Sequence, residues 1–150
     1  MTEDYIDELV GAGMTDIGID LKALRTSTFM EMTGLLDEGL ATKYLQTAWE
    51  AVKYLHDSHP QVFLGIGIPF NEDLISIAEI QEMAERIVSI DPWIQVCVLD
   101  YRPEFRRSDL VRPSHWEMLE VHYILRDCGL QSVVCQTERG KIGPAGRLLG

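Results

Sequence analysis

The sequence predicts an α/β fold in which helices alternate with the strands of a parallel sheet. Four segments carry apolar residues at helical spacing, and short runs rich in Ile and Val follow each of them, bounded by Gly, Pro or Asp. The order is α-β-α-β-α-β-α-β, which favours parallel strands joined by right-handed crossovers. A third observation is that charged residues follow the first and third strands. Doubly wound sheets and (βα) barrels both have this order.

Hydrophobic periodicity places the predicted elements along the chain. The helices are predicted at about 4–13, 41–56, 76–89 and 114–128. The strands are predicted at about 16–21, 62–68, 93–100 and 132–136. The last strand is the weakest, so we expect three to four parallel strands with covering helices. Pro69 is expected to end the second strand, because proline has no backbone N–H to donate.

Local signals mark the ends of several elements. Ser114 and Glu117 match an N-cap and a capping box, and Gly129 is well placed to end the same helix. Residues 25–39 are rich in Thr, Ser and Gly, which predicts a loop with a short helical piece. The glycine-rich residues 138–150 show no periodicity and are predicted to be irregular.

Large apolar side chains predict the core. We expect the second helix to bury one stripe of residues, and the tryptophans to lie in the core or pack against it. These residues are Tyr44, Leu45, Ala48, Val52, Leu55, Trp49, Trp93 and Trp116. His56 and His59 fall at the end of the second helix, where the helix dipole favours capping over metal binding.

The length of the chain limits the architecture. A complete eight-stranded barrel needs roughly 250 residues, whereas this chain has 150. Residues 1–137 are therefore expected to form a partial TIM-like (βα) barrel, about half of a complete one. The first predicted element is a helix with no strand before it, so we expect that an upstream part is missing.

Composition and charge exclude several classes of function. With 24 acidic and 13 basic residues, the chain has a formal net charge of −11, and this long-range field repels nucleic acid. No apolar run is long enough to span a membrane, and the acidic start is unlike a signal peptide. Cys97, Cys128 and Cys135 form no CxxC pair and are expected to be reduced thiols. We therefore expect a cytoplasmic protein that binds neither nucleic acid nor membranes.

The first predicted strand ends in two opposite charges. Because side chains alternate along a strand, Ile17, Ile19 and Leu21 share one face, which leaves Asp20 and Lys22 on the other. Both faces of a parallel sheet are usually covered, and ligands bind at the carboxyl ends of its strands. The pattern therefore predicts either a ligand site or a strand-end ion pair that binds no ligand.

Charged residues also follow the third predicted strand. Asp100 and Arg102 are expected to share a face with Val96 and Val98. We interpret that face as the barrel interior, with a strand-end ion pair as the alternative. The following loop is expected to be a solvated charged segment, with anion binding as its alternative. Its basic residues are Arg106, Arg107 and Arg112.

Three short motifs carry a resemblance to a known family. They are G-I-D-L-K at 18–22, G-I-P-F-N-E-D at 67–73 and L-D-Y-R-P-E-F at 99–105. Their order and spacing resemble the C-terminal half of radical SAM enzymes, in the branch related to pyruvate formate-lyase activating enzymes. The resemblance covers residues 2–136. It implies a parent reaction in which reductive cleavage of S-adenosylmethionine gives a 5′-deoxyadenosyl radical that abstracts hydrogen, with a partner protein as a candidate substrate.

The resemblance implies roles for residues at the strand ends. Asp20 matches a family aspartate that helps to bind a monovalent cation, and Lys22 matches the lysine near the S-adenosylmethionine carboxylate. Arg102 falls where family members often have His, at the mouth beside the ligand. An ammonium or guanidinium group there can pair with a carboxylate. Together with Asp100, these residues form the implied cofactor-binding set.

The chain departs from the family where the iron–sulfur cluster is bound. The family's CxxxCxxC loop, which holds a [4Fe-4S] cluster, does not occur here, nor does the glycine-rich segment of the N-terminal half. Phe70 replaces the usual Gly after Pro69, and Leu64 stands where activating enzymes tend to have Arg. S-adenosylmethionine and the [4Fe-4S] cluster are thus cofactors of the implied full-length protein, and none is expected for this chain alone.

Two functions from different classes follow. The chain is expected to be a C-terminal fragment of a radical SAM protein that contributes interior residues to S-adenosylmethionine and substrate binding without being catalytic alone. The alternative is a non-catalytic (βα) module that acts by assembly with another subunit. In both, the expected partner is the missing N-terminal half or a second copy, joined through open sheet edges. A third option, an unrelated small-molecule-binding domain, lacks the expected glycine-rich phosphate loop.

Overall fold

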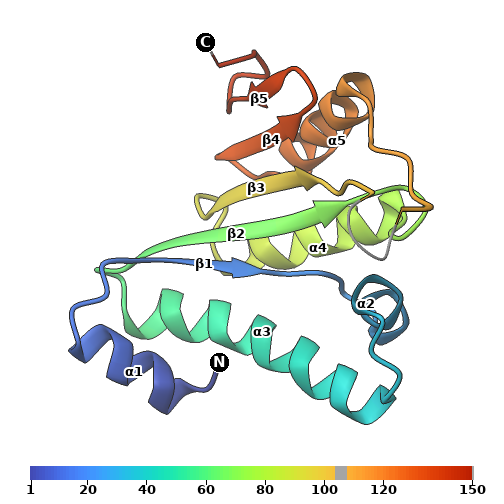
Figure 1. Ribbon diagram of the computed structural model, residues 1–150. Helices are drawn as coiled ribbons and strands as arrows, with labels where there is room; N and C mark the ends of the chain where they lie inside the picture. The colour runs from blue at the N-terminus through green and yellow to red at the C-terminus, as the bar shows by residue number, and fades with distance from the viewer. Residues whose placement is uncertain (104–107, 150) are drawn as a thin grey trace.

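Figure 1 shows the computed structural model, which describes residues 1–103 and 108–149. The helices are α1 (Glu3–Gly11), α2 (Thr26–Thr33), α3 (Glu38–Ser58), α4 (Ile77–Ile90) and α5 (His115–Asp127). The strands are β1 (Asp16–Asp20), β2 (Phe63–Phe70), β3 (Gln95–Asp100), β4 (Val133–Thr137) and β5 (Gly140–Ile142). The predicted alternation is confirmed through β4, and α2 is the short helical piece expected within residues 25–39.

The strands form one sheet in the order β1-β2-β3-β4-β5. From β1 to β4, each strand runs parallel to the next one in the sequence. β5 runs antiparallel to β4. Successive right-handed crossovers place their helices on the same side of a sheet, and α3, α4 and α5 lie along one side in Figure 1. The fold is therefore α/β with a mostly parallel sheet, an arrangement compatible with part of a (βα) barrel.

The two faces of the sheet differ in what covers them. Ile19, Ile66, Val96 and Val133 lie side by side in register and are buried, so we call their side the helix face. The residues that alternate with them form the opposite side, which we call the open face. Pro69 is buried on this face, but most of its residues are half-buried, and Gly18 is exposed: Gly18, Gly65, Gly67, Gln95, Cys97, Leu99 and Val134. Within the described part of the chain, the helices therefore cover one face of the sheet, and the open face is only partly shielded.

The predicted ends of α5 are confirmed. The Ser114 side chain accepts a hydrogen bond from the Glu117 backbone N–H, and the Glu117 carboxylate accepts one from the Ser114 N–H, which completes the capping box. After the helix, Gly129 adopts a φ of +112°, a left-handed conformation that glycine tolerates best. These signals depend only on neighbouring residues, so the sequence alone located them.

Pro69 does not end β2, which continues to Phe70. Phe63 donates its N–H to Thr15 and Leu21 donates to Gly67, so odd-numbered residues of β2 bond towards β1. The missing N–H of Pro69 would point beyond Asp20, where β1 has already ended. Leu21 still donates to Gly67 just past this end, so proline only stops the hydrogen bonding from continuing further and removes no bond within β1.

The segment after β4 is more ordered than expected. Residues 140–142 form β5, whose Ile142 pairs with Cys135 and is 1% exposed. Ile142 also forms an isolated antiparallel bridge with Leu148. Antiparallel strands can be joined by a two-residue turn, and Glu138 and Arg139 make that connection. The irregular conformation predicted for residues 138–150 is thus wrong at β5.

Several aromatic residues lie differently from their predicted positions. Trp49 is buried, as expected, but Trp93 and Trp116 are 71% and 65% exposed. Tyr44, predicted within the buried stripe of α3, is also exposed.

Of the helices described, none is long and apolar enough to cross a membrane.

Candidate functional site

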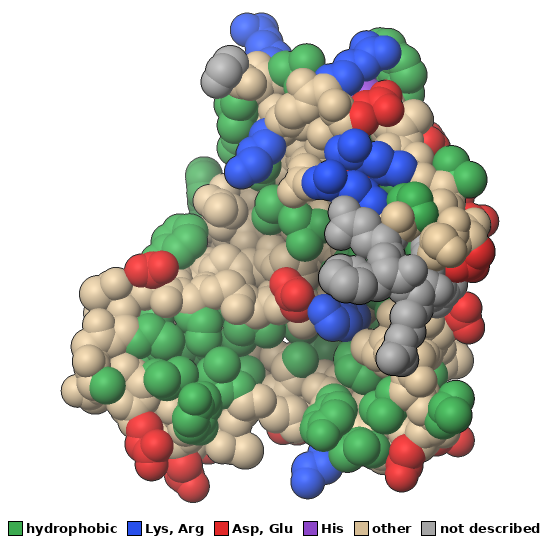
Figure 2. All heavy atoms as spheres, viewed as in Figure 1, with side chains coloured by type: hydrophobic (Ala, Val, Ile, Leu, Met, Phe, Trp, Pro, Cys, Tyr) green, Lys and Arg blue, Asp and Glu red, His purple; other side chains and the backbone are tan. Residues whose placement is uncertain are grey.

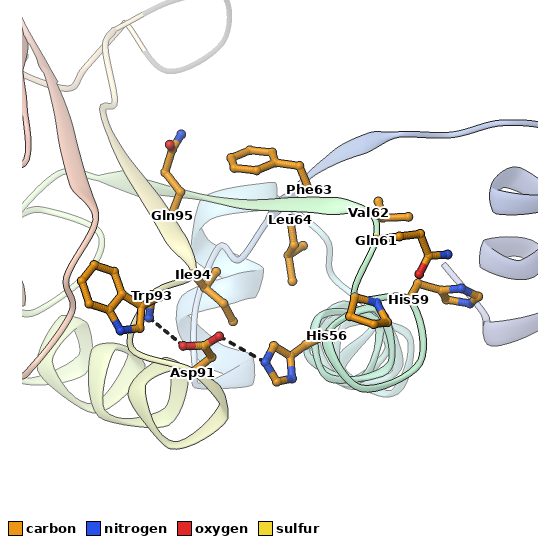
Figure 3. Close-up of a pocket in the computed structure, with 11 residues that line it drawn as sticks. His56, His59, Gln61, Val62, Phe63, Leu64, Asp91, Trp93, Ile94 and Gln95 are labelled. Carbon is orange, nitrogen blue, oxygen red and sulfur yellow. Dashed lines mark hydrogen bonds and ion pairs between the residues drawn. The ribbon is translucent and has the colours of Figure 1, made fainter.

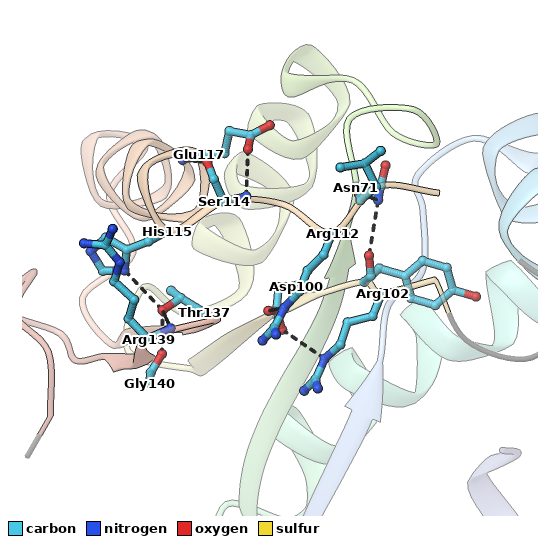
Figure 4. A network of polar contacts seen from close by, with 12 residues as sticks. Asn71, Asp100, Arg102, Arg112, Ser114, His115, Glu117, Thr137, Arg139 and Gly140 are labelled. Atoms are coloured by element: carbon cyan, nitrogen blue, oxygen red, sulfur yellow. Dashed lines mark hydrogen bonds and ion pairs between the residues drawn. The ribbon is translucent and has the colours of Figure 1, made fainter. Parts of the chain in front are cut away.

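The carboxyl ends of β1 to β4 gather polar side chains at one edge of the sheet. β1 leads into Asp20 and Lys22, β2 into Asn71, β3 into Asp100 and β4 into Thr137. This edge is where ligands bind in parallel α/β sheets. Figure 4 shows the part of this edge that follows β2, β3 and β4. We therefore treat it as the candidate functional site.

Asp20 and Lys22 meet on the open face, as the alternation predicted. The Lys22 Nζ lies 3.2 Å from the Asp20 Oδ2, and their side chains are 36% and 57% exposed. Asp20 leans over the neighbouring strand, because a Cβ at Gly67 would come within 2.5 Å of its Oδ1. Gly67 thus leaves the space that the carboxylate occupies. The accessible Lys22 ammonium group is therefore held beside the Asp20 carboxylate on the open face, at the carboxyl end of β1.

A buried glutamate fixes the loop that carries Lys22. The Glu79 Oε1 accepts hydrogen bonds from the backbone N–H groups of Leu24 and Arg25, at 2.8 and 2.9 Å. Its Oε2 accepts one from the Thr28 hydroxyl at 2.7 Å and lies 3.3 Å from the Arg25 guanidinium. Its side chain is 3% exposed. Glu79 therefore ties the start of α4 to the segment that follows β1.

Opposing effects act on the pKa of Glu79. Burial alone would raise it, but the hydrogen bonds from the Arg25 N–H, the Thr28 hydroxyl and the Leu24 N–H outweigh burial and hold the pKa below its usual value. The carboxylate is therefore charged at neutral pH. A partial signal for Glu79 is present in the sequence, because Ser76 and Glu79 match a capping box. The Ser76 hydroxyl does accept from the Glu79 N–H, but the Glu79 side chain points to the other loop.

The same loop is anchored from α3. The buried indole Nε1 of Trp49 donates to the Ala23 carbonyl at 3.0 Å, and Ala23 is itself fully buried. Together with Glu79, this bond fixes the residues that directly follow Lys22. The ammonium group is thus presented from a constrained loop, although its own side chain remains accessible.

Asp100 points to the helix face and not to the open face. It shares that face with Val96 and Val98, as predicted, but the helices cover this side of the sheet. The assignment of this face to a barrel interior is therefore wrong. Its Oδ2 accepts from the Arg112 Nε at 2.6 Å, and its Oδ1 lies 3.9 Å from the Arg102 Nε (Figure 4). The strand-end ion pair considered as the alternative is what the structure contains.

The two arginines at Asp100 have different environments. The carboxylate is fully buried, and Arg112 covers it with a short charge-assisted hydrogen bond. Arg102 is 41% exposed and stays beyond hydrogen-bonding distance of Asp100. Arg102 is therefore accessible to an anionic ligand, whereas Arg112 is held in place by its hydrogen bond to Asp100. Arg106 and Arg107, also considered for anion binding, lie outside the described residues.

Asn71 holds the ends of β2 and β3 together. Its Nδ2 donates to the carbonyls of Tyr101 and Val111, at 3.2 and 2.8 Å, and its Oδ1 accepts from the Asp73 N–H at 3.0 Å. Asn71 is 1% exposed, so all three bonds form in a buried site. In the sequence, Asn71 stood out only as part of the motif at 67–73, after the predicted end of the second strand. Its partners could not be predicted, because two of them lie some thirty to forty residues away.

Basic side chains gather near the end of β4. Figure 2 shows them together in the upper half of the visible face, while acidic side chains lie mostly towards its margins. Arg139 places its guanidinium 5.8 Å from the centre of the Trp116 ring. Below it, the His115 Nδ1 lies 3.1 Å from the Thr137 hydroxyl, which donates to the Gly140 carbonyl. This part of an otherwise acidic protein is suited to an anionic ligand.

A separate cavity lies at the opposite, amino-terminal edge of the sheet (Figure 3). It has a volume of about 460 Å³ and lies between the end of α3 and the starts of β2 and β3. His56 faces Asp91 across it, with the His56 Nε2 3.3 Å from the Asp91 Oδ2, and the exposed Trp93 lies beside them. The Asp91 Oδ1 also accepts the Trp93 N–H at 2.8 Å. These contacts stabilise the turn before β3, so the cavity is distinct from the strand-end site.

The cysteines do not suit an iron–sulfur cluster. Cys97 lies on the open face, Cys135 is buried on the helix face and Cys128 caps α5, and all three are free thiols. Burial raises the pKa of Cys135 far above its usual value. Among the residues described, no group of three or more His, Cys, Asp or Glu side chains could hold a metal ion. No chemical step is therefore assigned to a cluster on this chain.

Comparison with known proteins adds no family assignment. No protein-family model matches the sequence, and no curated protein matches it either. Function is therefore inferred from the geometry of the strand ends and from the three motifs described above.

Proposed function

We propose that this chain forms the C-terminal half of a radical SAM-like (βα) barrel and helps to bind S-adenosylmethionine and substrate. The observation that supports this most directly is the placement of Lys22 and Asp20. Both lie on the open face at the carboxyl end of a parallel strand, and the Lys22 ammonium is accessible. A complementary half would turn this open face into the interior of a barrel.

Lys22 would bind the carboxylate of S-adenosylmethionine. Its ammonium is a compact charge with three donors, of which the contact with Asp20 uses one. The Asp20 carboxylate, which lies over Gly67, holds the Lys22 ammonium, and Glu79 fixes the loop that follows Lys22. Arg102, exposed beside the end of β3, is placed for an anionic group on the substrate.

The reaction would require groups that this chain does not carry. In the assembled enzyme, a [4Fe-4S] cluster held by the other half would supply the electron that cleaves bound S-adenosylmethionine. The residues of this chain would bind and orient the ligand and exclude water from the interior. The three free thiols fit the reducing cytoplasm in which such a protein would work.

The second candidate function is assembly without catalysis. The open face of the sheet favours it, since parallel sheets usually have helices on both faces and the described helices cover only one. Exposed Phe63 lies on the open face next to Asp16, where a partner could cover it. In this alternative, Lys22 and Arg102 have no ligand.

The first test is to find the complementary half. Translation of the DNA directly upstream of the Met1 codon, in all three forward frames, should reveal a CxxxCxxC motif within roughly 100–125 residues, half the length of a barrel. That half, expressed together with this chain, should then bind it and protect Cys97 from alkylation, because Cys97 lies on the open face. Absence of the motif upstream would favour the assembly module.

A further inference from the structure

The two edges of the sheet are not equivalent. β5 pairs antiparallel with β4, and Ile142 of β5 bridges to Leu148, so this side is already covered. On the other side, β1 pairs with β2, and no described strand pairs with its outer edge. A new strand can therefore be added at β1 without displacing any described part of the fold.

The hydrogen bonds within the sheet show which groups of β1 point outwards. Leu21 donates its N–H to the Gly67 carbonyl at 2.8 Å, and the Thr15 carbonyl accepts from Phe63 at 2.9 Å. Odd-numbered residues of β1 therefore bond towards β2. Because strand groups alternate, the N–H and C=O groups of Gly18 and Asp20 point towards the free edge. Both residues are exposed.

We propose that the β1 edge binds the β1 edge of a second copy of this chain, antiparallel and centred on Ile19. Symmetric dimers bring the same surface of both copies together, and two-fold pairing of identical strands is antiparallel. Centring on Ile19 places Gly18 opposite Asp20 of the other copy. Both residues have outward-pointing backbone groups, so they form hydrogen-bonded pairs on each side of the axis.

Charge selects this register over its neighbours. With Ile19 at the centre, Asp16 lies opposite Lys22 of the second copy, which makes two cross-strand pairs of opposite charge. If Gly18 were at the centre, Asp16 would lie opposite Asp20, and these like charges would repel each other. If Leu21 were at the centre, most of the overlap would fall beyond Asp20, where β1 ends. The register centred on Ile19 combines opposite charges with overlap of the strands.

This inference goes beyond the proposed ligand site, since it concerns the backbone edge of the isolated chain and requires no ligand. A complementary half would add a parallel strand at the same edge and would compete with the dimer. The contact is short, so we expect reversible association in the micromolar to millimolar range. The test of the dimer measures the mass of the protein in solution and the exchange of its backbone amides. A negative result in either measurement would leave the ligand proposal unaffected.

Sedimentation equilibrium of the isolated chain tests the dimer. Gly18→Pro removes an outward N–H without removing a bond to β2, and no atom lies within 4 Å of an added Cβ. Asp16→Lys and Lys22→Asp each reverse one charge of the cross-strand pair, and the double variant restores the pair. We expect each single variant to weaken the dimer about tenfold or more, and the double charge reversal to restore it.

Hydrogen exchange of the wild-type chain supplies evidence that does not depend on any variant. The amides of Gly18 and Asp20 should become protected as the protein concentration rises, whereas the amide of Ile19, bonded to β2, should be protected at all concentrations. A chain that stays monomeric up to about 1 mM would overturn the proposal. So would a dimer that tolerates Gly18→Pro and leaves the Gly18 and Asp20 amides in rapid exchange.

Discussion

The carboxylate of Asp20 occupies the space beside Gly67 where any other residue would carry its Cβ. The two residues come from neighbouring strands and lie directly opposite each other in register. The contact explains why a glycine, which normally weakens a strand, lies at this position. It also directs the carboxylate towards Lys22.

Gly67→Ala should therefore displace Asp20 and separate it from Lys22. An added Cβ would come within 2.5 Å of the Asp20 Oδ1, so the short side chain must rotate away. Stability should change by no more than about 1 kcal/mol, because Asp20 is exposed and alanine favours the strand over glycine. The ¹³C shift of the Asp20 carboxyl and the ¹⁵N shift of the Lys22 Nζ would report the separation. Gly65→Ala, which meets only ordinary contacts, is the control and should leave both shifts unchanged.

Glu79 should be more important for stability than its neighbour Glu82. Glu79→Gln loses acceptors for buried donors, so the free energy of unfolding should fall by about 1–3 kcal/mol. Glu82→Gln is the matched control, because Glu82 is 45% exposed and contacts only the Arg25 side chain in the described contacts. Its cost should stay within about 0.5 kcal/mol. Urea unfolding of both variants measures the difference, and equal losses would contradict the role given to Glu79.

Glu79 should also contribute to acid sensitivity. Its pKa in the folded protein lies below its usual value of 4.5, so its contribution to stability is complete above about pH 4.5 and is lost as the pH falls through the lowered pKa. In urea unfolding at a series of pH values, the stability gap between the wild type and Glu79→Gln should therefore narrow at low pH. If the stability difference between the wild type and Glu79→Gln widened on acidification, the lowered pKa of Glu79 would be contradicted.

The buried pair of Asp100 and Arg112 should respond unequally to the loss of each partner. Arg112→Met leaves a buried carboxylate without its hydrogen bond and should cost about 3 kcal/mol or more. Asp100→Asn leaves a neutral group, and Arg112 can turn to water, so about 1 kcal/mol is expected. The double variant should cost less than the sum of the two. Additive losses in urea unfolding would mean that the two side chains are not coupled.

Two histidines should give opposite pH dependences. Burial lowers the pKa of His122 from its usual 6.5, so its neutral form stabilises the fold above that pH and stability is lost on acidification. The hydrogen bond to Asp57 raises the pKa of His56, so its contribution is complete below pH 6.5 and is lost as the pH rises through the raised pKa. Urea unfolding of His122→Gln and His56→Gln between about pH 5 and pH 8 measures both effects. If the stability lost relative to the wild type changed in the same direction with pH in both variants, this assignment would be contradicted.

Patterns within single segments predicted most of the fold. Periodicity located α1, α3, α4, α5 and β1 to β4, and the capping box at Ser114 marked the start of α5 within one residue. Alternation also placed Asp20 and Lys22 together on one face, where the structure has them in contact. These features depend on residues close together in the sequence, so a single sequence contains the information.

Features that depend on distant contacts were missed. Alternation placed Asp100 with Val96 and Val98, but it could not show which face the helices cover, because both faces of β3 carry apolar residues. The partners of the Glu79 carboxylate are more than fifty residues away, and the two carbonyls that Asn71 donates to are at least thirty. β5 gains its order from pairing with β4, which its own glycine-rich sequence does not indicate.

The central claim is that Lys22 binds the carboxylate of S-adenosylmethionine, and decarboxylated S-adenosylmethionine tests it most directly. Equilibrium dialysis should compare both ligands with this chain assembled with the proposed complementary half, which would carry CxxxCxxC. We expect the wild type to prefer S-adenosylmethionine by about tenfold, and Lys22→Ala to lose that preference. Lys53→Ala, a lysine on α3 paired with Asp57, is the control and should keep it. Equal affinity of the wild type for both ligands would contradict the account.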